Sequence, residues 1–284
     1  MDLLPFLALP FIAGLILTGI HAYLGVHVVE RGVIFVDLSL AQIAALGSTI
    51  AVMQGYDVHG NVAYFWSLGF TIIGAAIFAL TRVHRATRIP QEAIIGIVYA
   101  VSAAAAILAM SKATGETEHL KDMLVGNILA VDPPTLIKTA ILYAFVGLFH
   151  FIFRSKFLAI SIGAHNGNAE NIPNLKWWDF LFYTSFGFVV TSSVAIAGVL
   201  LVFSYLIVPS VAAMLFSRRI GVRLAIGWSM GAIVSALGIM LSFKLDLPTG
   251  ATIVCTFGLA LAVTAIIWAI RRPRFIEEAS ASAL

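Results

Sequence analysis

Long apolar runs, each near 20 residues, alternate along the chain with short segments that carry most of the charged residues. A helix needs about 20 apolar residues to cross a bilayer, and a window of about 19 residues detects such helices. Membrane β-barrels show shorter segments of alternating polarity, so the pattern favours an all-α, polytopic membrane protein. It predicts eight long transmembrane helices near residues 4–28, 33–53, 61–81, 90–110, 135–153, 179–202, 222–243 and 250–270.

The apolar run over 179–217 is too long for a single crossing. Gly198 and Pro209 interrupt it, which predicts a full helix followed by a short or half-crossing helix at about 205–217. Helices broken by glycine or proline often lie near the working part of a transporter. Further along, Pro248 and Gly250 predict a tight turn before the last helix, because both residues constrain the backbone.

Composition supports the membrane assignment. Hydrophobic residues make up 61% of the 284 residues and charged residues only 11%, whereas soluble domains contain about 25% charged residues. The single Cys255 excludes a disulfide framework or a cysteine metal cluster within one chain. The N-terminal stretch lacks the basic region of a signal peptide, so we interpret it as a retained first helix.

Basic residues gather in alternate connections between the predicted helices, and acidic residues gather in the others. Basic residues favour the cytoplasmic side, and the net charge of +3 therefore reflects topology rather than nucleic-acid binding. The alternation places the N-terminus outside and the C-terminus in the cytoplasm, provided that the short helix counts as a crossing. We expect one transmembrane domain over 1–273 and a disordered tail over 274–284.

Two connections are longer than turns. The outer connection has apolar residues at helical spacing between charges, which predicts an amphipathic helix on the membrane surface at about 116–130. The inner connection, at about 154–178, is a cytoplasmic loop that is too small to form a catalytic domain. A cytoplasmic partner would have to dock there.

The stretch from Glu30 to Gly47, ERGVIFVDLSLAQIAALG, places Asp37, Ser39 and Gln42 inside an apolar run. Polar groups at membrane depth are costly and usually face a protein interior or a water-filled path. We therefore interpret these three side chains as lining a translocation path. Tyr99 and Ser102, in the predicted fourth helix, reach a depth similar to that of Gln42 and are further candidates.

Each candidate also has a structural interpretation. Gln42 could form a hydrogen bond between helices, and Asp37 could pair with Arg31. Tyr99 could simply pack, and Glu92 could stabilise the first turn of its helix through the helix dipole. The histidines show no metal-binding spacing, and we expect His27 and His59 to be solvated or interfacial side chains.

Five segments, taken together and in this order, resemble the permease subunits of ABC importers for divalent transition metals, the zinc, manganese and iron class known as the ABC-3 family. The likeness extends from about residue 10 to 271. The segments are ERGVIF, QEAIIGIVYAVSAA, GNILAVDPP, VAIAGVLLVFSYLIVPSVAAMLFSRR and the loop DLPTG.

The resemblance implies a type II importer fold in the bacterial cytoplasmic membrane, with two copies of this chain forming a homodimer. It also implies two copies of a separate ATPase and an extracellular or periplasmic solute-binding protein. The chain contains no phosphate-binding loop of the form GxxxxGK[ST], so ATP hydrolysis would occur in the partner and this chain is not an enzyme. We expect no bound cofactor, with the divalent metal as the transported substrate.

The chain departs from the family pattern in its second helix. Family members carry an aspartate and, four residues later, a histidine for the metal, and here Leu38 and Gln42 occupy those positions. Asp37 comes one residue early, and at about 100° per residue Asp37 and Gln42 point roughly 140° apart. A π-bulge could rotate Asp37, the site could be rebuilt, or the cargo could differ, with an oxygen-preferring ion favoured.

The inner connection also departs from the family pattern, where an acidic residue and small residues precede a glycine. Here the sequence reads GAHNGNAENIPN. The residues that the resemblance assigns to ATPase coupling are Gly163, Ala164, Asn168, Ala169 and Glu170.

A stand-alone secondary transporter or channel for ions or small solutes is the alternative function. It would place ionisable residues at the midplane of several spans, whereas the sequence predicts a deep charge only in the second. An intramembrane enzyme would need a nucleophile and base or a metal triad, and the sequence contains no such pattern.

Overall fold

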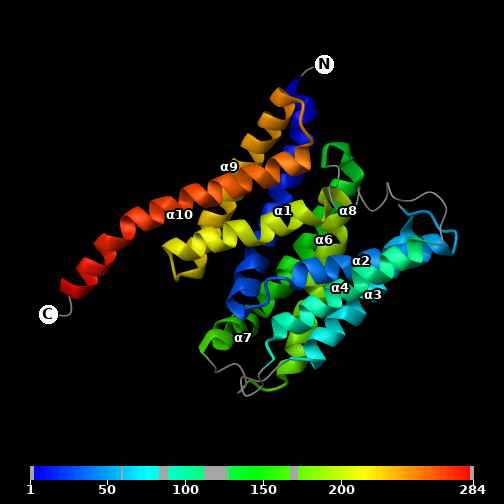
Figure 1. Cartoon of the computed structure of the whole chain (residues 1–284), viewed down its shortest axis with the longest axis horizontal. Helices are drawn as coiled ribbons and strands as arrows, with labels where there is room; N and C mark the ends of the chain where they lie inside the picture. The colour runs from blue at the N-terminus through cyan, green and yellow to red at the C-terminus, as the bar shows by residue number, and fades with distance from the viewer. Residues whose placement is uncertain are drawn as a thin grey trace.

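A computed structural model describes residues 3–58, 60–82, 89–111, 126, 128–166 and 172–281. Within these ranges all regular elements are helical, and eight helices are long and apolar enough to cross a membrane (Figure 1). The all-α, eight-span prediction is confirmed. The elements are α1 (Leu3–Arg31), α2 (Val36–Met53), α3 (Asn61–Leu80), α4 (Gln91–Met110), η1 (Ile128–Ala130), α6 (Pro133–Ile152), α7 (Arg154–Asn166), α8 (Leu175–Phe216), α9 (Ile220–Leu245) and α10 (Thr249–Ala281).

The helices form two groups that share α8. Helix α2 packs on both α3 and α4, and α2 and α3 also contact α8. On the other side, α1, α9 and α10 pack against α8 and α9 contacts both α1 and α10. Figure 1 shows α2, α3 and α4 side by side at one end of the molecule and α9 and α10 at the other. Helices α1 and α8 therefore form the centre.

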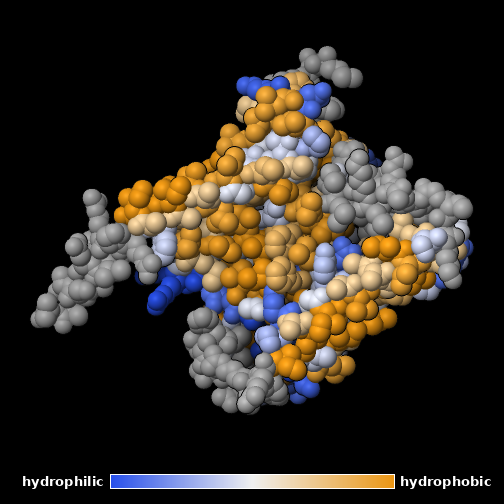
Figure 2. Space-filling model, viewed as in Figure 1, coloured by the Kyte–Doolittle hydropathy of each residue, from blue (hydrophilic) through white to orange (hydrophobic). Residues whose placement is uncertain are grey.

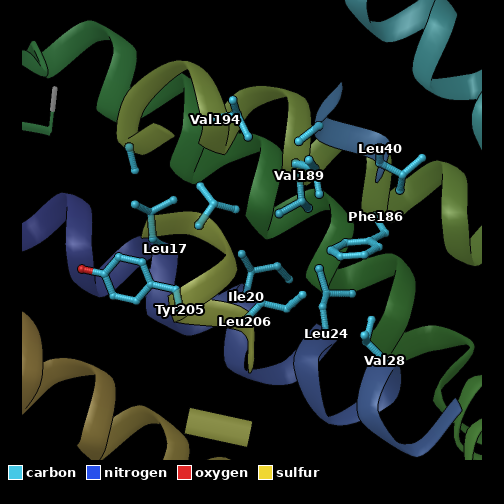
Figure 3. Packing of buried hydrophobic residues seen from close by; sticks show 14 of the residues in the cluster. Leu17, Ile20, Leu24, Val28, Leu40, Phe186, Val189, Val194, Tyr205 and Leu206 are labelled. Carbon is cyan, nitrogen blue, oxygen red and sulfur yellow. The ribbon is translucent and has the colours of Figure 1, made fainter. Parts of the chain in front are cut away.

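The core lies between α1 and α8. Leu17, Ile20, Leu24 and Val28 recur every three or four residues and form one buried face of α1. Figure 3 shows this face directed at side chains of α8, with Leu40 of α2 nearby. The partners from α8 that the figure labels are Phe186, Val189, Val194, Tyr205 and Leu206.

Large apolar side chains also cover the outside of the bundle, as the orange surface in Figure 2 shows. Phe65, Leu108, Phe145 and Ile270 are each more than 60% exposed, and they belong to α3, α4, α6 and α10. A soluble protein rarely exposes contiguous apolar surface of this extent. These faces are consistent with contact with lipid.

The long apolar run folds as one helical segment, α8, which breaks at Gly198. Gly198 has a φ of 74° and a ψ of 160°, in a region that essentially only glycine adopts. The second part thus begins at about residue 199 rather than at the predicted 205. Pro209 lies inside this part and residues on both sides of it remain helical. Gly126 lies against the break, since a Cβ on Gly126 would come within 2.1 Å of the Ala197 carbonyl carbon.

The inner connection contains a helix where the sequence analysis expected a loop. Helix α7 buries Phe157, Ile160 and Ser161 and contacts α1, α6 and α8. The spacing of these three residues forms one face of a helix, and packing of that face accounts for the difference.

The remaining connections match the sequence in part. Of the outer amphipathic helix expected at about 116–130, the structure describes Gly126 and η1, and the rest of that prediction lies outside the described residues. Before α10, Asp246 adopts a positive φ of 52°, Pro248 lies in the turn and Gly250 is the second residue of the helix. Helix α10 continues to Ala281, into the segment expected to be a disordered tail.

Candidate translocation path

Asp37 lies in the first turn of α2 and its side chain is almost completely buried. Its Oδ1 atom has no hydrogen-bond partner in the described part of the chain. A carboxylate near a helix N-terminus is favoured by the helix dipole, but a buried acceptor without a donor remains costly.

Ser39 and Gln42 lie on the same helix as Asp37 but do not form a cluster with it. Ser39 is fully buried and its Oγ atom also lacks a partner among the described residues, whereas Gln42 is half-buried. Helix α2 is regular from Val36 to Met53, without a π-bulge. Asp37 and Gln42 therefore keep the angle of about 140° that the sequence predicts, too wide for both to bind one ion.

The two candidates on α4 differ in their surroundings. Ser102 is buried, whereas Tyr99 is 38% exposed. Its neighbours Ile97 and Val101 are exposed as well. In the described part of the chain, no hydrogen bond or ring contact joins Tyr99 or Ser102 to the candidates of α2, although α2 and α4 pack together. Within one chain, Ser102 is thus the better candidate for a path-lining residue.

Arg31 does not pair with Asp37, which was the structural alternative for that carboxylate. Arg31 Nη1 donates to Asp179 Oδ1 of α8 at 2.8 Å, and Arg82 donates to the other oxygen of the same carboxylate. Asp179 is fully buried and the Arg31 side chain is only 3% exposed. Sequence reasoning missed Asp179 because it is the first residue of the predicted span 179–202 and comes soon after basic Lys176, where a carboxylate at a membrane edge is unremarkable. The structure therefore buries charges in helices other than the second.

Buried polar residues of α1, α6, α7 and α8 also contact one another across helix boundaries. We call this set the polar seam. It comprises His21, Tyr23, His27, Tyr143, His150, Ser161, Ser185 and Ser193. In a membrane such interhelical hydrogen bonds contribute about 0.6 kcal/mol each on average. The seam holds the four helices in register.

His150 lies at the middle of the seam. Its ring stacks on Phe157 of α7, with 4.4 Å between ring centroids. Ser185 donates its hydroxyl proton to the Phe182 carbonyl, so His150 Nε2 donates to Ser185 Oγ at 2.8 Å. Tyr23 of α1 then donates to His150 Nδ1 at 3.3 Å. One imidazole therefore links α1, α6 and α8.

His27 is not the solvated or interfacial side chain that the sequence analysis expected. It is 1% exposed, because α7 folds back over the C-terminal end of α1. Ser161 donates its proton to the Phe157 carbonyl, so His27 Nδ1 donates to Ser161 Oγ at 2.8 Å. This assignment leaves His27 Nε2 as an acceptor without a partner in the described chain. The other histidine of that prediction, His59, lies outside the described residues.

His21 belongs to the part of the polar seam that lies further from α7 than His27 does. Its Nδ1 atom donates to the Leu17 carbonyl at 2.8 Å, and its Nε2 atom lies within hydrogen-bond distance of Ser193 Oγ of α8, at 3.1 Å. Tyr143 of α6 also bonds to Ser193. The recurrence of His21, Tyr23, His27 and Arg31 along α1 was the available sequence signal, but their partners lie on other helices. Among the described residues, no three His, Cys, Asp or Glu side chains are placed to hold one metal ion.

Glu92, at the start of α4, reaches the neighbouring helix. Its Oε1 atom accepts from the backbone N–H of Phe35 at 3.0 Å, at the residue that precedes α2. The side chain thus caps α2 in addition to lying in the first turn of its own helix.

The residues proposed for ATPase coupling are described only in part. Gly163 is buried in α7 and Ala164 continues that helix. Asn168, Ala169 and Glu170 lie outside the described residues, so their role stays a prediction.

Comparison with known proteins places this geometry in context. A sequence model of the ABC 3 transport family matches residues 4–268. The manganese transport system membrane protein MntC of Listeria monocytogenes is 27% identical over 80% of this chain and 81% of its own length. The chelated iron transport system membrane protein YfeC of Yersinia pestis is 26% identical over 78% of this chain and 80% of its own length.

Solved structures share the fold. The structure described as PsaBC from Streptococcus pneumoniae in complex with Fab has a chain that superposes with a TM-score of 0.73 and 21% identity. The superposition covers 91% of the present chain and 90% of the chain from that structure. A metal-chelate type ABC transporter in an inward-facing conformation superposes with a TM-score of 0.69 and 16% identity, over 91% of this chain and 85% of that chain.

Proposed function

This chain belongs to the ABC 3 transport family, and we propose that it is the membrane-spanning subunit of an ATP-driven importer of divalent transition metal ions. The family match over nearly the whole chain carries this proposal. Relatives are named for manganese and for chelated iron, and zinc remains a third candidate cargo. Transport would proceed by alternating access without covalent chemistry in this chain.

The importer would contain three further components. A separate ATPase would hydrolyse ATP and dock at α7 and the segment that follows it, with Gly163, Ala164, Asn168, Ala169 and Glu170 as candidate contacts. A second copy of this chain would form a homodimer, and a solute-binding protein would deliver the metal on the opposite side. The exposed apolar faces support a membrane location, and the family match points to the bacterial inner membrane. The alternation of basic and acidic connections favours an N-terminus outside and a C-terminus in the cytoplasm.

Asp37 is the side chain best suited to contact the cargo. A buried carboxylate oxygen without a donor is stabilised when a cation approaches, and carboxylate oxygen suits hard ions such as Mn²⁺. Gln42 lies further along α2 and points elsewhere. We therefore infer that Asp37 and Gln42 contact the ion in succession during transport rather than binding it together.

Reconstitution tests the function. The chain, its ATPase and its binding protein would be placed in vesicles, and uptake of Mn²⁺, Fe²⁺ and Zn²⁺ would be measured with and without ATP. We expect uptake of at least one ion that requires both ATP and the ATPase. Uptake by the chain alone would favour the stand-alone secondary transporter or channel, and uptake of none of the three would refute the metal assignment.

The substitution Asp37→Asn tests the cargo contact. It removes the charge with little change in volume, and we expect metal uptake to fall while the complex still assembles. The matched control is Asp132→Asn, at an exposed carboxylate that caps α6, because asparagine caps a helix about as well as aspartate. Equal uptake by the two variants would exclude Asp37 from the path.

A further inference from the structure

The inner end of α1 carries two adjacent charged residues that reach different parts of the molecule. Glu30 accepts from Arg223 at the start of α9, whereas Arg31 donates to Asp179 of α8. The next residue, Gly32, ends the helix with a positive φ of 67°. We call Glu30 and Arg31 the charged fork. Through it, one turn of α1 contacts both the α9 side and the α7 and α8 side of the bundle.

The side chain of Arg31 is held in one orientation. Its Cζ atom lies 3.8 Å from the centroid of the Phe182 ring, which stacks beneath the guanidinium plane. Nη1 donates to Asp179 and Nε donates to Ser161 at 2.9 Å, while Nη2 is buried without a partner. The guanidinium is planar, and its N–H donors have a fixed geometry. Displacement of one partner therefore strains the bond to the other.

The contact with Ser161 is the one that reaches α7. Ser161 uses its only proton for the Phe157 carbonyl within α7, so its oxygen accepts from both Arg31 and His27 of α1. Ser161 is 2% exposed, and water does not compete for these bonds. A shift of α7 relative to α1 would therefore disturb both of these hydrogen bonds.

We propose that Arg31 is a positioning residue that couples movement of α7 to α1 and α8 during transport. The movement would pass from Ser161 through the Arg31 guanidinium to Asp179. Arg82, which follows α3, shares the Asp179 carboxylate. Glu30 fixes the same turn of α1 to Arg223 of α9. This inference rests on the proposed function, because it takes docking of the ATPase at α7 as the source of the movement.

The test compares ATP hydrolysis with metal uptake in vesicles containing the whole complex. Ser161→Ala removes the acceptor of Arg31 Nε but keeps the ion pair with Asp179. We expect ATP hydrolysis to continue while the metal taken up per ATP hydrolysed falls about tenfold, the factor for loss of one hydrogen bond to a charged group. A defect in assembly would lower both rates together instead.

Ser185→Ala is the matched control. Ser185 also donates to a carbonyl of its own helix at 2.9 Å and accepts from a buried histidine at 2.8 Å, as Ser161 does, but it does not contact Arg31. We expect Ser185→Ala to keep the wild-type ratio of metal to ATP. A second variant, Arg31→Lys, keeps the positive charge beside Asp179 but lacks the Nε–H donor, and we expect it to lower the ratio as Ser161→Ala does.

The outcomes separate the two levels of the argument. A wild-type ratio in either Ser161→Ala or Arg31→Lys, with ATP-driven uptake by the wild-type complex, overturns the coupling role and leaves the importer assignment intact. An equal fall in Ser185→Ala overturns it as well, because the effect would then not be specific to Arg31. Absence of ATP-driven uptake by the wild-type complex refutes the proposed function and this inference with it.

Discussion

Helix α1 and the second part of α8 contact each other backbone to backbone at Gly25. A Cβ atom at this position would lie 2.0 Å from the Leu206 carbonyl oxygen and 2.3 Å from Ser210 Oγ. Ser210 also donates to the Ala22 carbonyl at 3.2 Å across the same contact. Close approach of this kind requires a small residue at the helix crossing. The substitution Gly25→Ala is therefore expected to separate the two helices.

The size of the effect follows from the distances. The Leu206 oxygen would have to move by about 1 Å to reach 3.0 Å, below which Cβ contacts essentially never occur, and it is backbone rather than a flexible side chain. Overpacking of this kind costs about 1–3 kcal/mol. Alanine gains about 1 kcal/mol over glycine in helix propensity, which offsets only part of that cost. We expect net destabilisation.

Thermal unfolding in detergent measures this prediction, with Gly19→Ala as the control. Gly19 lies on the same helix, and a Cβ there would meet nothing within 4 Å. We expect the unfolding temperature to fall by several degrees for Gly25→Ala and to stay level or rise for Gly19→Ala. An unfolding temperature for Gly25→Ala equal to or above that of the control would refute the close contact.

Two further predictions concern carboxylates. Asp179→Asn leaves Arg31 and Arg82 facing each other without their shared counter-charge, and loss of one partner of a buried ion pair costs about 3–5 kcal/mol. We expect a large fall in the thermal unfolding temperature. A wild-type unfolding temperature would contradict burial of the ion pair. A hydrogen bond from Thr135 lowers the pKa of the exposed Asp132, so its cap of α6 is intact above the ordinary aspartate pKa and is lost as the pH falls through the lowered value. Asp132→Ala should therefore speed backbone hydrogen exchange in the first turn of α6 at neutral pH and leave it unchanged at strongly acidic pH. Exchange in the variant as slow as in the wild type at neutral pH would show that the cap is unimportant.

The membrane spans could be predicted because crossing a bilayer depends on a local property, the length of an apolar run. The break in α8 could be predicted only approximately. Gly198 and Pro209 are both candidates in the sequence, but only Gly198 has backbone angles outside the helical region. The contact of Gly126 with Ala197 lies at that point, and this tertiary contact has no local sequence signal.

The polar contacts of the core were the least predictable part. His27 is close in sequence to Glu30 and Arg31, which suggests a wet membrane edge. Helix α7 covers it instead. The length of the inner connection suggested a loop, and only the packing of Phe157 shows how α7 folds back. Partners that are more than 100 residues apart, such as His27 and Ser161, cannot be paired from one sequence.

The charged fork also bears on Asp37, the residue that first suggested a path. Arg31 is the nearest arginine before Asp37 in the sequence, but Asp179 and Ser161 hold its guanidinium. Glu30 is likewise held by Arg223. The neighbouring charged side chains are therefore held in ion pairs at the C-terminal end of α1. Asp37 keeps a buried oxygen without a donor, and we infer that the passing cation supplies the missing partner. From the sequence, we expect this carboxylate one residue before the position that the family resemblance implies. Such a shift would change where the cargo meets a carboxylate along the path, and not whether it meets one.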